Sequence, residues 1–178
     1  MKASTTRIRI VGVGGQGVIR ASTTLAIAAL IEGFEVSQSQ AYGAEVTGTP
    51  SLGDVIISRK PIRFPYVETA DVMVSLHNIG WKRYKDTLRD DGVLIYDSVL
   101  SDEASNHTVK YKYSIPAVKI AEEHIEDKMS FNMVILGYMV KCTNVVSLDS
   151  LIKAVRHIFG GDNVKVEKAV ISGYEYVP

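Results

Sequence analysis

Four closely spaced glycines carry the clearest chemical signal in this sequence: Gly12, Gly14, Gly15 and Gly17. The β-branched apolar run before them predicts a strand, and the apolar spacing after them predicts a helix that stops before Gly33. Such a turn needs glycine because the chain reverses sharply, often with positive φ, and its backbone comes close to a ligand or to the helix. The helix N-terminus would then offer unpaired N–H groups and a partial positive charge to an anion, most often a phosphate.

The glycine spacing also fits the dinucleotide-binding pattern G-x-G-x-x-G through Gly12, Gly14 and Gly17. The complete pattern requires an acidic residue roughly 20 residues further on, at the end of the second strand, to bind a ribose. Residues 34–41, the predicted second strand, end in serine and glutamine, and their acid, Glu35, stands at the opposite end. One possible function is therefore a stand-alone dinucleotide-binding oxidoreductase, but the sequence lacks the acidic residue that would bind the ribose. A second alternative is an assembly module whose glycines pack helix against strand and bind no ligand.

The remaining side chains of catalytic types do not form a recognisable set. The four histidines lack metal-ligand spacing, and Cys142 lies in an apolar segment with no candidate base beside it. No lysine precedes Ser22 as in a P-loop, so ATP hydrolysis is disfavoured. Two polar residues that follow buried strands, His77 and Asp97, could line a cleft at the carboxyl edge of the sheet. We predict no catalytic residue and no metal ligand in this chain.

Length and composition indicate a single domain over residues 1–178. The chain is 46% hydrophobic and 22% charged, and its 20 basic and 20 acidic side chains create no net field that would attract nucleic acid or an anionic membrane. One cysteine excludes a disulfide framework and any iron–sulfur or zinc site built from several cysteines. Because no apolar segment is long enough for a signal peptide or a membrane span, we expect a soluble protein of the reducing cytoplasm.

Strands and helices alternate along the first half of the chain. After the second strand, residues 42–53 predict an ordered loop, and residues 54–58, 71–76 and 93–97 predict buried strands. A helix with Trp81, Tyr84 and Leu88 on its apolar face should end at Asp91 and Gly92. The continuous apolar strands predict a three-layer α/β fold, with a largely parallel or mixed sheet, helices on both faces and a Rossmann-like N-terminal unit. In a parallel sheet the 42–53 loop would lie near the glycine turn.

The second half of the chain is more helical. Residues 109–115 alternate apolar and polar side chains, which indicates a half-exposed strand near a sheet edge. Residues 116–128 predict a helix, and residues 131–142 predict a helix that is apolar on nearly every side, buried in the domain or against a partner chain. Residues 147–158 and 163–174 predict two further helices, the first capped by Ser147.

Several short motifs together resemble the gamma subunit of 2-oxoacid:ferredoxin oxidoreductases, over residues 7 to 155. They are Gly14-Gly15-Gln16-Gly17, Tyr42-Gly43-x-Glu45-x-x-Gly48, Asp54-Val55-Ile56-Ile57-Ser58, Leu94-Ile95-Tyr96-Asp97-Ser98, Ile115-Pro116-Ala117 and Asn132-Met133-x-x-Leu136-Gly137. The pair GGQG and YGxE is much more specific than G-x-G-x-x-G alone. The resemblance implies an α/β subunit of a complex that oxidatively decarboxylates a 2-oxoacid such as pyruvate, ketoisovalerate or 2-oxoglutarate, forms acyl-coenzyme A and reduces ferredoxin.

The resemblance also implies where ligands and partners lie. Thiamine diphosphate would belong to alpha and beta subunits and the iron–sulfur clusters to a ferredoxin-like delta subunit, so the isolated chain should be inactive. The apolar segment 131–142 and two tyrosines of the predicted edge strand, Tyr111 and Tyr113, favour a homo-oligomer of the isolated chain. The glycine turn and the YGxE loop would face these partners and the path of coenzyme A, which acts as co-substrate. The residues that the resemblance assigns to this binding site are Gly12, Gly14, Gly15, Gln16, Gly17, Tyr42, Gly43, Glu45 and Thr47.

The second loop departs from the pattern of the family it resembles. Where members commonly have YGPExRGG, this chain has Ala44 in place of the proline and Thr47 in place of the arginine. Thr47 can donate a hydrogen bond but has no charge to pair with a phosphate. Arg20, one turn into the first helix, is a candidate for the missing cation.

Overall fold

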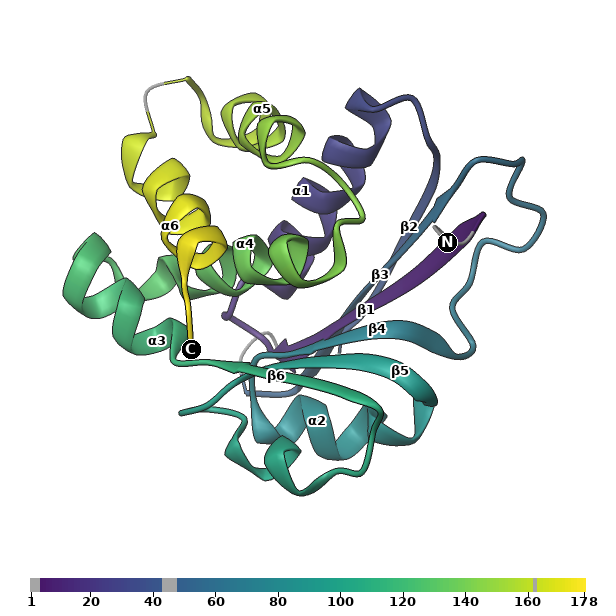
Figure 1. The fold of residues 1–178 in the computed structure, drawn as a ribbon, viewed down its shortest axis with the longest axis horizontal. Helices are drawn as coiled ribbons and strands as arrows, with labels where there is room; N and C mark the ends of the chain where they lie inside the picture. Colours follow the sequence, from purple (N-terminus) through teal and green to yellow (C-terminus); the bar gives the residue numbers. More distant parts are fainter. Residues whose placement is uncertain (1–3, 43–47, 162) are drawn as a thin grey trace.

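The computed structural model describes residues 4–42, 48–161 and 163–178, and its centre is a six-stranded mixed sheet (Figure 1). The strands are β1 (Thr5–Val13), β2 (Glu35–Tyr42), β3 (Pro50–Ser58), β4 (Ala70–Ser75), β5 (Leu88–Asp97) and β6 (Tyr111–Ile115). Their order is β2-β3-β1-β4-β5-β6. Strands β1, β4, β5 and β6 are parallel to their neighbours in that group, whereas β3 runs antiparallel to both β1 and β2. The prediction of a largely parallel or mixed sheet is confirmed as a mixed sheet.

Helices cover both faces of the sheet, which confirms the predicted three layers. Four long helices and a short one lie on one face, and a seven-residue helix lies on the other (Figure 1). The first group is α1 (Val18–Ile31), α3 (Ala117–Ile120), α4 (Phe131–Thr143), α5 (Leu148–Phe159) and α6 (Val164–Glu175), and the helix on the other face is α2 (Asn78–Tyr84). Alternation along β1 sends Ile8 and Ile10 into the larger core under the first group and Val11 into the smaller core under α2.

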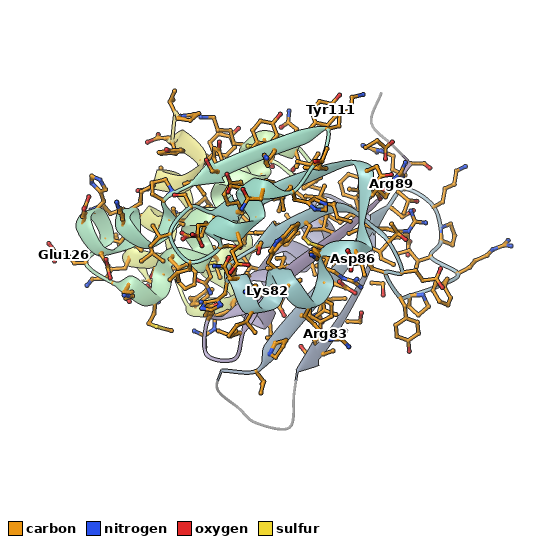
Figure 2. All side chains as sticks on the ribbon, turned by 90° about the horizontal axis from the view of Figure 1, so that it is seen from below. Lys82, Arg83, Asp86, Arg89, Tyr111 and Glu126 are labelled. Carbon is orange, nitrogen blue, oxygen red and sulfur yellow. The ribbon has the colours of Figure 1, made fainter. Side chains whose placement is uncertain are left out.

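Helix α4 is buried because it lies between the sheet and the outer helices. Every residue from Phe131 to Val140 is buried, so the apolar character of this segment is explained within the domain. Helix α5 begins as predicted, with the Ser147 hydroxyl accepting a hydrogen bond from the Ser150 N–H at 3.1 Å. The predicted edge strand is also confirmed, because β6 is the outermost strand and Tyr111 projects from it into solvent (Figure 2).

Three predicted boundaries are wrong. The first is the helix through Leu88: α2 ends at Tyr84, a 3₁₀ turn (Lys85–Thr87) follows, and Leu88 begins β5. The Leu88 side chain packs with Met73 of the sheet, so its apolar character serves a strand. The helical spacing of three aromatic and aliphatic residues was therefore coincidental.

The second error is the continuous helix over residues 116–128. It is split into α3, a π-helical turn (Ala121–Ile125) and a 3₁₀ turn (Lys128–Ser130), with Glu126 at a positive φ of 56°. The Asp127 side chain starts the last turn by accepting a hydrogen bond from the Met129 N–H at 3.1 Å. The third error is the extent of the 42–53 loop, because β3 already begins at Pro50, where a strand can accept proline.

Candidate functional site at the glycine turn

The glycine turn joins the carboxyl end of β1 to α1, and its glycines serve two separate purposes. Gly15 and Gly17 have φ of 93° and 72°, a backbone conformation that other residues adopt only with strain. Gly12 is instead closely packed, because a methyl group on Gly80 of α2 would overlap the Gly12 backbone. A methyl group on Gly12 would itself meet Gln16 Oε1 at 2.7 Å. The packing role weighed in the sequence analysis is therefore real for Gly12, but it does not account for Gly15.

Hydrogen bonds within the chain satisfy part of the turn. The Gly14 N–H donates to the Thr49 carbonyl at 2.9 Å, and the Gln16 N–H donates to the Val13 carbonyl at 3.2 Å. The Gln16 side chain, assigned to the binding site in the sequence analysis, accepts a hydrogen bond from the Val13 N–H at 3.0 Å. Gln16 thus closes the turn on itself through its side-chain oxygen.

Other donors of the turn remain available. No side chain of the described residues caps the N-terminus of α1, whose first intrahelical bond runs from the Ala21 N–H to the Gly17 carbonyl at 2.9 Å. The N–H groups of the first helical turn therefore lack intrahelical acceptors. Within residues 4–42, 48–161 and 163–178, the N–H groups of Gly15 and Gly17 also have no acceptor. Gly15 is exposed, so these donors lie where an anion could approach.

Asn132 of α4 holds the glycine turn in place, a role that the sequence analysis missed. Its side-chain amide donates to the Gly17 carbonyl at 3.1 Å across 115 residues, and the residue is only 4% exposed. A methyl group on Gly17 would collide with that amide. The signal in the sequence was a lone amide in an otherwise apolar helix, since a buried polar group needs a partner.

A small hollow of about 190 Å³ lies beside the turn, and we call it the Arg20 hollow. Its lining residues are Arg20, Asp127, Met129, Ser130, Asn132, Met133, Phe159, Asn163, Lys165 and Val166. The Arg20 guanidinium lies 5.3 Å from the centroid of the Phe159 ring, which holds it by a cation–π contact. The Asp127 carboxylate is already engaged, because it accepts from the Ser130 hydroxyl at 2.6 Å. Arg20 and Lys165 therefore give this hollow a positive balance.

The residues that flank the second loop, Tyr42 and Thr49, lie near the glycine turn. Strand β2 runs in the same direction as β1, since both are antiparallel to β3, so Tyr42 ends at the edge that carries the glycine turn. The hydrogen bond from Gly14 to Thr49 confirms that the end of this loop lies against the turn. Three residues assigned to the binding site, Gly43, Glu45 and Thr47, lie outside the described residues.

The polar residues predicted to line a cleft have structural partners instead. Asp97 is fully buried, and its carboxylate accepts from the N–H groups of Val99, Leu100 and Val118 at 2.7–3.0 Å. It joins the end of β5 to α3 and does not line an open cleft, which corrects the prediction. His77 does lie at the carboxyl edge, where its Nδ1 accepts from the Ile79 N–H at 3.1 Å and caps α2.

Cys142, the one cysteine of the chain, lies in α4 and is only partly exposed. Burial raises the pKa of the Cys142 thiol, which lowers its thiolate fraction near neutral pH and makes it a poor nucleophile. In the described part of the chain, no group of three or more His, Cys, Asp or Glu residues could hold a metal ion. Among those same residues no helix has the length and apolar character to cross a membrane.

Comparison with known sequences gives one family over nearly the whole chain. Residues 7–176 match the family described as pyruvate ferredoxin/flavodoxin oxidoreductase. The 2-oxoglutarate synthase subunit KorC of Methanocaldococcus jannaschii is 37% identical over 171 residues, covering 94% of this chain and 91% of that protein. The pyruvate/ketoisovalerate oxidoreductases common subunit gamma of Pyrococcus abyssi is 32% identical over 176 residues, covering 94% of this chain and 95% of its own length.

Comparison with solved structures gives the same fold. The gamma subunit of a keto/oxoacid ferredoxin oxidoreductase from Geobacter sulfurreducens superposes with a TM-score of 0.81 at 31% identity, covering 96% of each chain. A 2-oxoglutarate:ferredoxin oxidoreductase from Magnetococcus marinus, solved with 2-oxoglutarate, coenzyme A and succinyl-CoA bound, superposes with a TM-score of 0.83 at 23% identity. The match covers 98% of this chain and 30% of that one, and at this identity it shows a shared fold alone.

Proposed function

This chain belongs to the pyruvate ferredoxin/flavodoxin oxidoreductase family, as a subunit of gamma type, and from that premise we propose that its glycine turn faces the coenzyme A path of a 2-oxoacid:ferredoxin oxidoreductase. The complex would convert a 2-oxoacid and coenzyme A into acyl-coenzyme A and carbon dioxide, and pass two electrons to ferredoxin. The decarboxylation and electron-transfer chemistry would belong to other subunits. This chain would complete the entrance through which coenzyme A reaches them.

The observation that carries the proposal is the uncapped N-terminus of α1 beside an exposed Gly15. A helix end of this kind attracts the phosphates of a ligand through its free N–H groups and its partial positive charge. The turn is also held rigid by Asn132 and by the bond from Gly14 to Thr49, so its donors need no reorganisation on binding.

Arg20 and Lys165 support the proposal by supplying positive charge at the same place. The sequence lacks the arginine that commonly follows YGxE in this family, and the Arg20 hollow beside the turn contains both cations. We propose that these two side chains replace that arginine in neutralising phosphate charge. Glu45 and Thr47, on the second loop, would contact the ligand from the other side.

The partner subunits follow from the cofactors that the reaction needs. We propose alpha and beta subunits that carry thiamine diphosphate and a ferredoxin-like delta subunit that carries the iron–sulfur clusters. This chain has a single cysteine, which does not fit an iron–sulfur cluster with several cysteine ligands. The exposed edge strand β6 is available for contact with these subunits. We expect the complex in the cytoplasm, where such clusters and free thiols persist.

Two glycines with the same backbone constraint provide the test. Gly15 and Gly33 both have positive φ, and a methyl group on either would meet no described atom within 4 Å. Gly33 lies beyond the C-terminal end of α1, far from the turn, so Gly33→Ala controls for backbone strain of roughly 1–2 kcal/mol. In the reconstituted complex we expect Gly15→Ala to raise the KM for coenzyme A about five- to thirtyfold, which corresponds to 1–2 kcal/mol at a helix N-terminus.

The same pair of variants decides between the proposal and its rivals. If the turn only packs the fold, both variants should lower the unfolding temperature alike and leave the KM for coenzyme A unchanged. A dinucleotide site is opposed by the geometry, because Glu35 pairs with Ser58 at the end of β2 remote from the turn. Binding of NAD or FAD to the isolated chain, lost in Gly15→Ala, would favour that alternative.

A further inference from the structure

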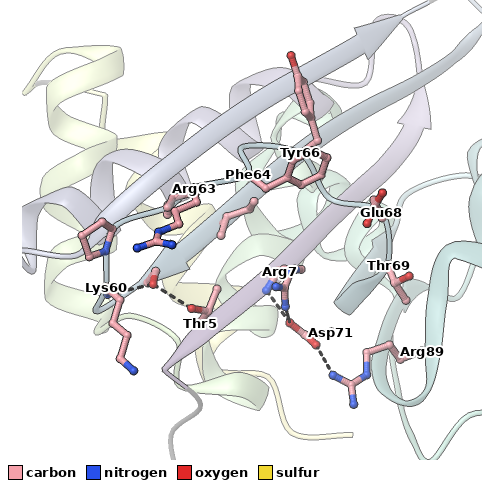
Figure 3. A pocket seen from close by; sticks show the side chains of 14 residues that line it. Thr5, Arg7, Lys60, Arg63, Phe64, Tyr66, Glu68, Thr69, Asp71 and Arg89 are labelled. Atoms are coloured by element: carbon pink, nitrogen blue, oxygen red, sulfur yellow. Dashed lines mark hydrogen bonds and ion pairs between the residues drawn. The ribbon is translucent and has the colours of Figure 1, made fainter.

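A second hollow lies at the opposite end of β1, on the face of the sheet that α2 covers only in part (Figure 3). Its volume is about 520 Å³, within the range of small-molecule sites. Its floor includes Thr5 and Arg7 of β1 and Ser58 of β3, and one wall is the segment of residues 60–69 between β3 and β4. We call it the 60–69 hollow.

The wall of the 60–69 hollow is fixed to the sheet. The buried Arg9 guanidinium donates to the Val67 carbonyl at 2.5 Å, and the Ser37 hydroxyl donates to the Pro65 carbonyl at 3.0 Å. The Val67 side chain also packs in a small apolar cluster with Ile56 of β3. The hollow is therefore formed before any ligand arrives, which reduces the entropy cost of binding.

Charge inside the hollow is unevenly distributed. Asp71 is already neutralised, because its carboxylate accepts from Arg89 Nη1 at 2.9 Å and lies 3.7 Å from Arg7 Nη1. Lys60 and Arg63, at the other end of the hollow, have side chains with no partner among the described residues, and Glu68 points into the end away from them (Figure 3). The end that contains Lys60 and Arg63 therefore has an excess of positive charge.

The side chains at that end specify the chemistry of a ligand. Arginine offers a planar fork of donors and lysine a compact charge, and both bind phosphate oxygens by charge-assisted hydrogen bonds. Phe64 and Tyr66 lie on the rim of the hollow and are 55% and 61% exposed. Their rings pack edge to face with centroids 5.6 Å apart, and an apolar ring of a ligand could pack against them. We propose that the 60–69 hollow binds a small phosphate-bearing molecule through Lys60 and Arg63, at a site separate from the coenzyme A path.

Calorimetry on the full chain tests this proposal with inorganic pyrophosphate and with ADP as probes. We expect saturable binding of pyrophosphate that weakens as salt is added, because the contacts are between exposed charges. ADP binding more tightly than pyrophosphate would identify a nucleotide that uses the aromatic rim, and equal affinities would identify a ligand bound by phosphate alone. Lys60→Ala with Arg63→Ala should weaken binding by about tenfold or more for each cation removed.

A matched control separates this site from general charge attraction. Lys82 and Arg83 match the lysine and arginine of the hollow in type, and they lie on the exposed side of α2, away from the 60–69 hollow (Figure 2). Lys82→Ala with Arg83→Ala removes the same charge and should leave the affinity for pyrophosphate within about twofold, since exposed charges away from a ligand contribute little. Arg63→Lys, which keeps the charge and loses the fork, should retain part of the binding.

Two outcomes would overturn the proposal. The first is that the unmodified chain shows no saturable pyrophosphate binding at millimolar concentration and low salt. The second is that Lys60→Ala with Arg63→Ala and Lys82→Ala with Arg83→Ala lower the affinity for pyrophosphate by the same factor. All substituted residues are exposed, and circular dichroism melts verify that each variant is folded. Failure of the coenzyme A proposal would not affect this result, because the two sites lie at opposite ends of β1 and share no residue.

Discussion

Arg9 is the residue that links the parts of the α2 face. Its guanidinium forms two parallel hydrogen bonds with the Asp54 carboxylate at 2.8 and 2.9 Å, and each side chain is 7% exposed. The same guanidinium holds the Val67 carbonyl and lies 5.8 Å from the centroid of the Tyr84 ring. Adjacent strands, the 60–69 segment and the end of α2 therefore all depend on one buried cation.

We expect Arg9→Met to lower the free energy of unfolding by about 3–5 kcal/mol, because Asp54 would be left buried without its partner. The double variant Arg9→Met with Asp54→Leu should regain most of that loss, since apolar side chains of similar volume can replace a buried ion pair. Urea unfolding followed by circular dichroism measures both. Lys153→Ala, which breaks an exposed pair with Asp149, serves as the control and should cost under about 1 kcal/mol. A double variant as unstable as the single one would show that the contact with Val67, rather than the paired charge, is what stabilises this face.

At the scale of elements, the crossing of α4 and α6 depends on two glycines. Gly137 of α4 lies against the Val170 carbonyl, and Gly173 of α6 lies against the Val134 carbonyl. The absence of side chains at both positions lets the two helix backbones approach closely, and this contact closes the helical layer over the buried α4. The glycines here have ordinary helical geometry, so the constraint comes from packing and not from φ.

Gly173→Ala should lower the free energy of unfolding by at least about 3 kcal/mol, the upper end for overpacking, because a methyl group would overlap a backbone carbonyl that cannot move alone. Thermal unfolding monitored by circular dichroism measures the effect. At Gly161, in the turn between α5 and α6, a methyl group would meet no described atom, so Gly161→Ala is the control and should change stability by under about 0.5 kcal/mol. Equal melting temperatures for the two variants would contradict the close crossing.

At the scale of the molecule, the sheet separates two different ends. The glycine turn and the Arg20 hollow lie at the carboxyl end of β1, and the 60–69 hollow lies at its amino end. Helices α1 and α4 support the first end, and the Arg9 network supports the second. A rigid sheet of this kind suits a subunit that presents binding surfaces to partners.

We expect the isolated chain to bind neither thiamine diphosphate nor an iron–sulfur cluster, and to release no carbon dioxide from any 2-oxoacid. The reason is its single cysteine and the lack of a thiamine-binding motif. Visible absorbance after anaerobic purification and a carbon dioxide assay check this, with the reconstituted complex as the positive control. A brown purified chain, or decarboxylation without partners, would contradict the assignment of this chemistry to other subunits.

The sequence by itself determined the features that depend on neighbouring residues. The strand, glycine turn and first helix, the cap at Ser147 and the apolar α4 are all confirmed, because periodicity and capping act within a few residues. The short motifs from GGQG onward also indicated the family, which the comparisons confirm. Where local spacing misled, as in the helix through Leu88, a residue with helical spacing packs against the sheet instead.

Only the tertiary structure decided how these elements meet. The antiparallel insertion of β3 between β2 and β1, the hold of Asn132 on Gly17 and the Arg9 network all join residues far apart in the chain. No local pattern encodes such pairings, because a buried amide or guanidinium takes whichever partner the folded backbone brings within hydrogen-bonding distance. The same reason explains why Asp97 became a buried anchor for backbone N–H groups rather than the wall of a cleft.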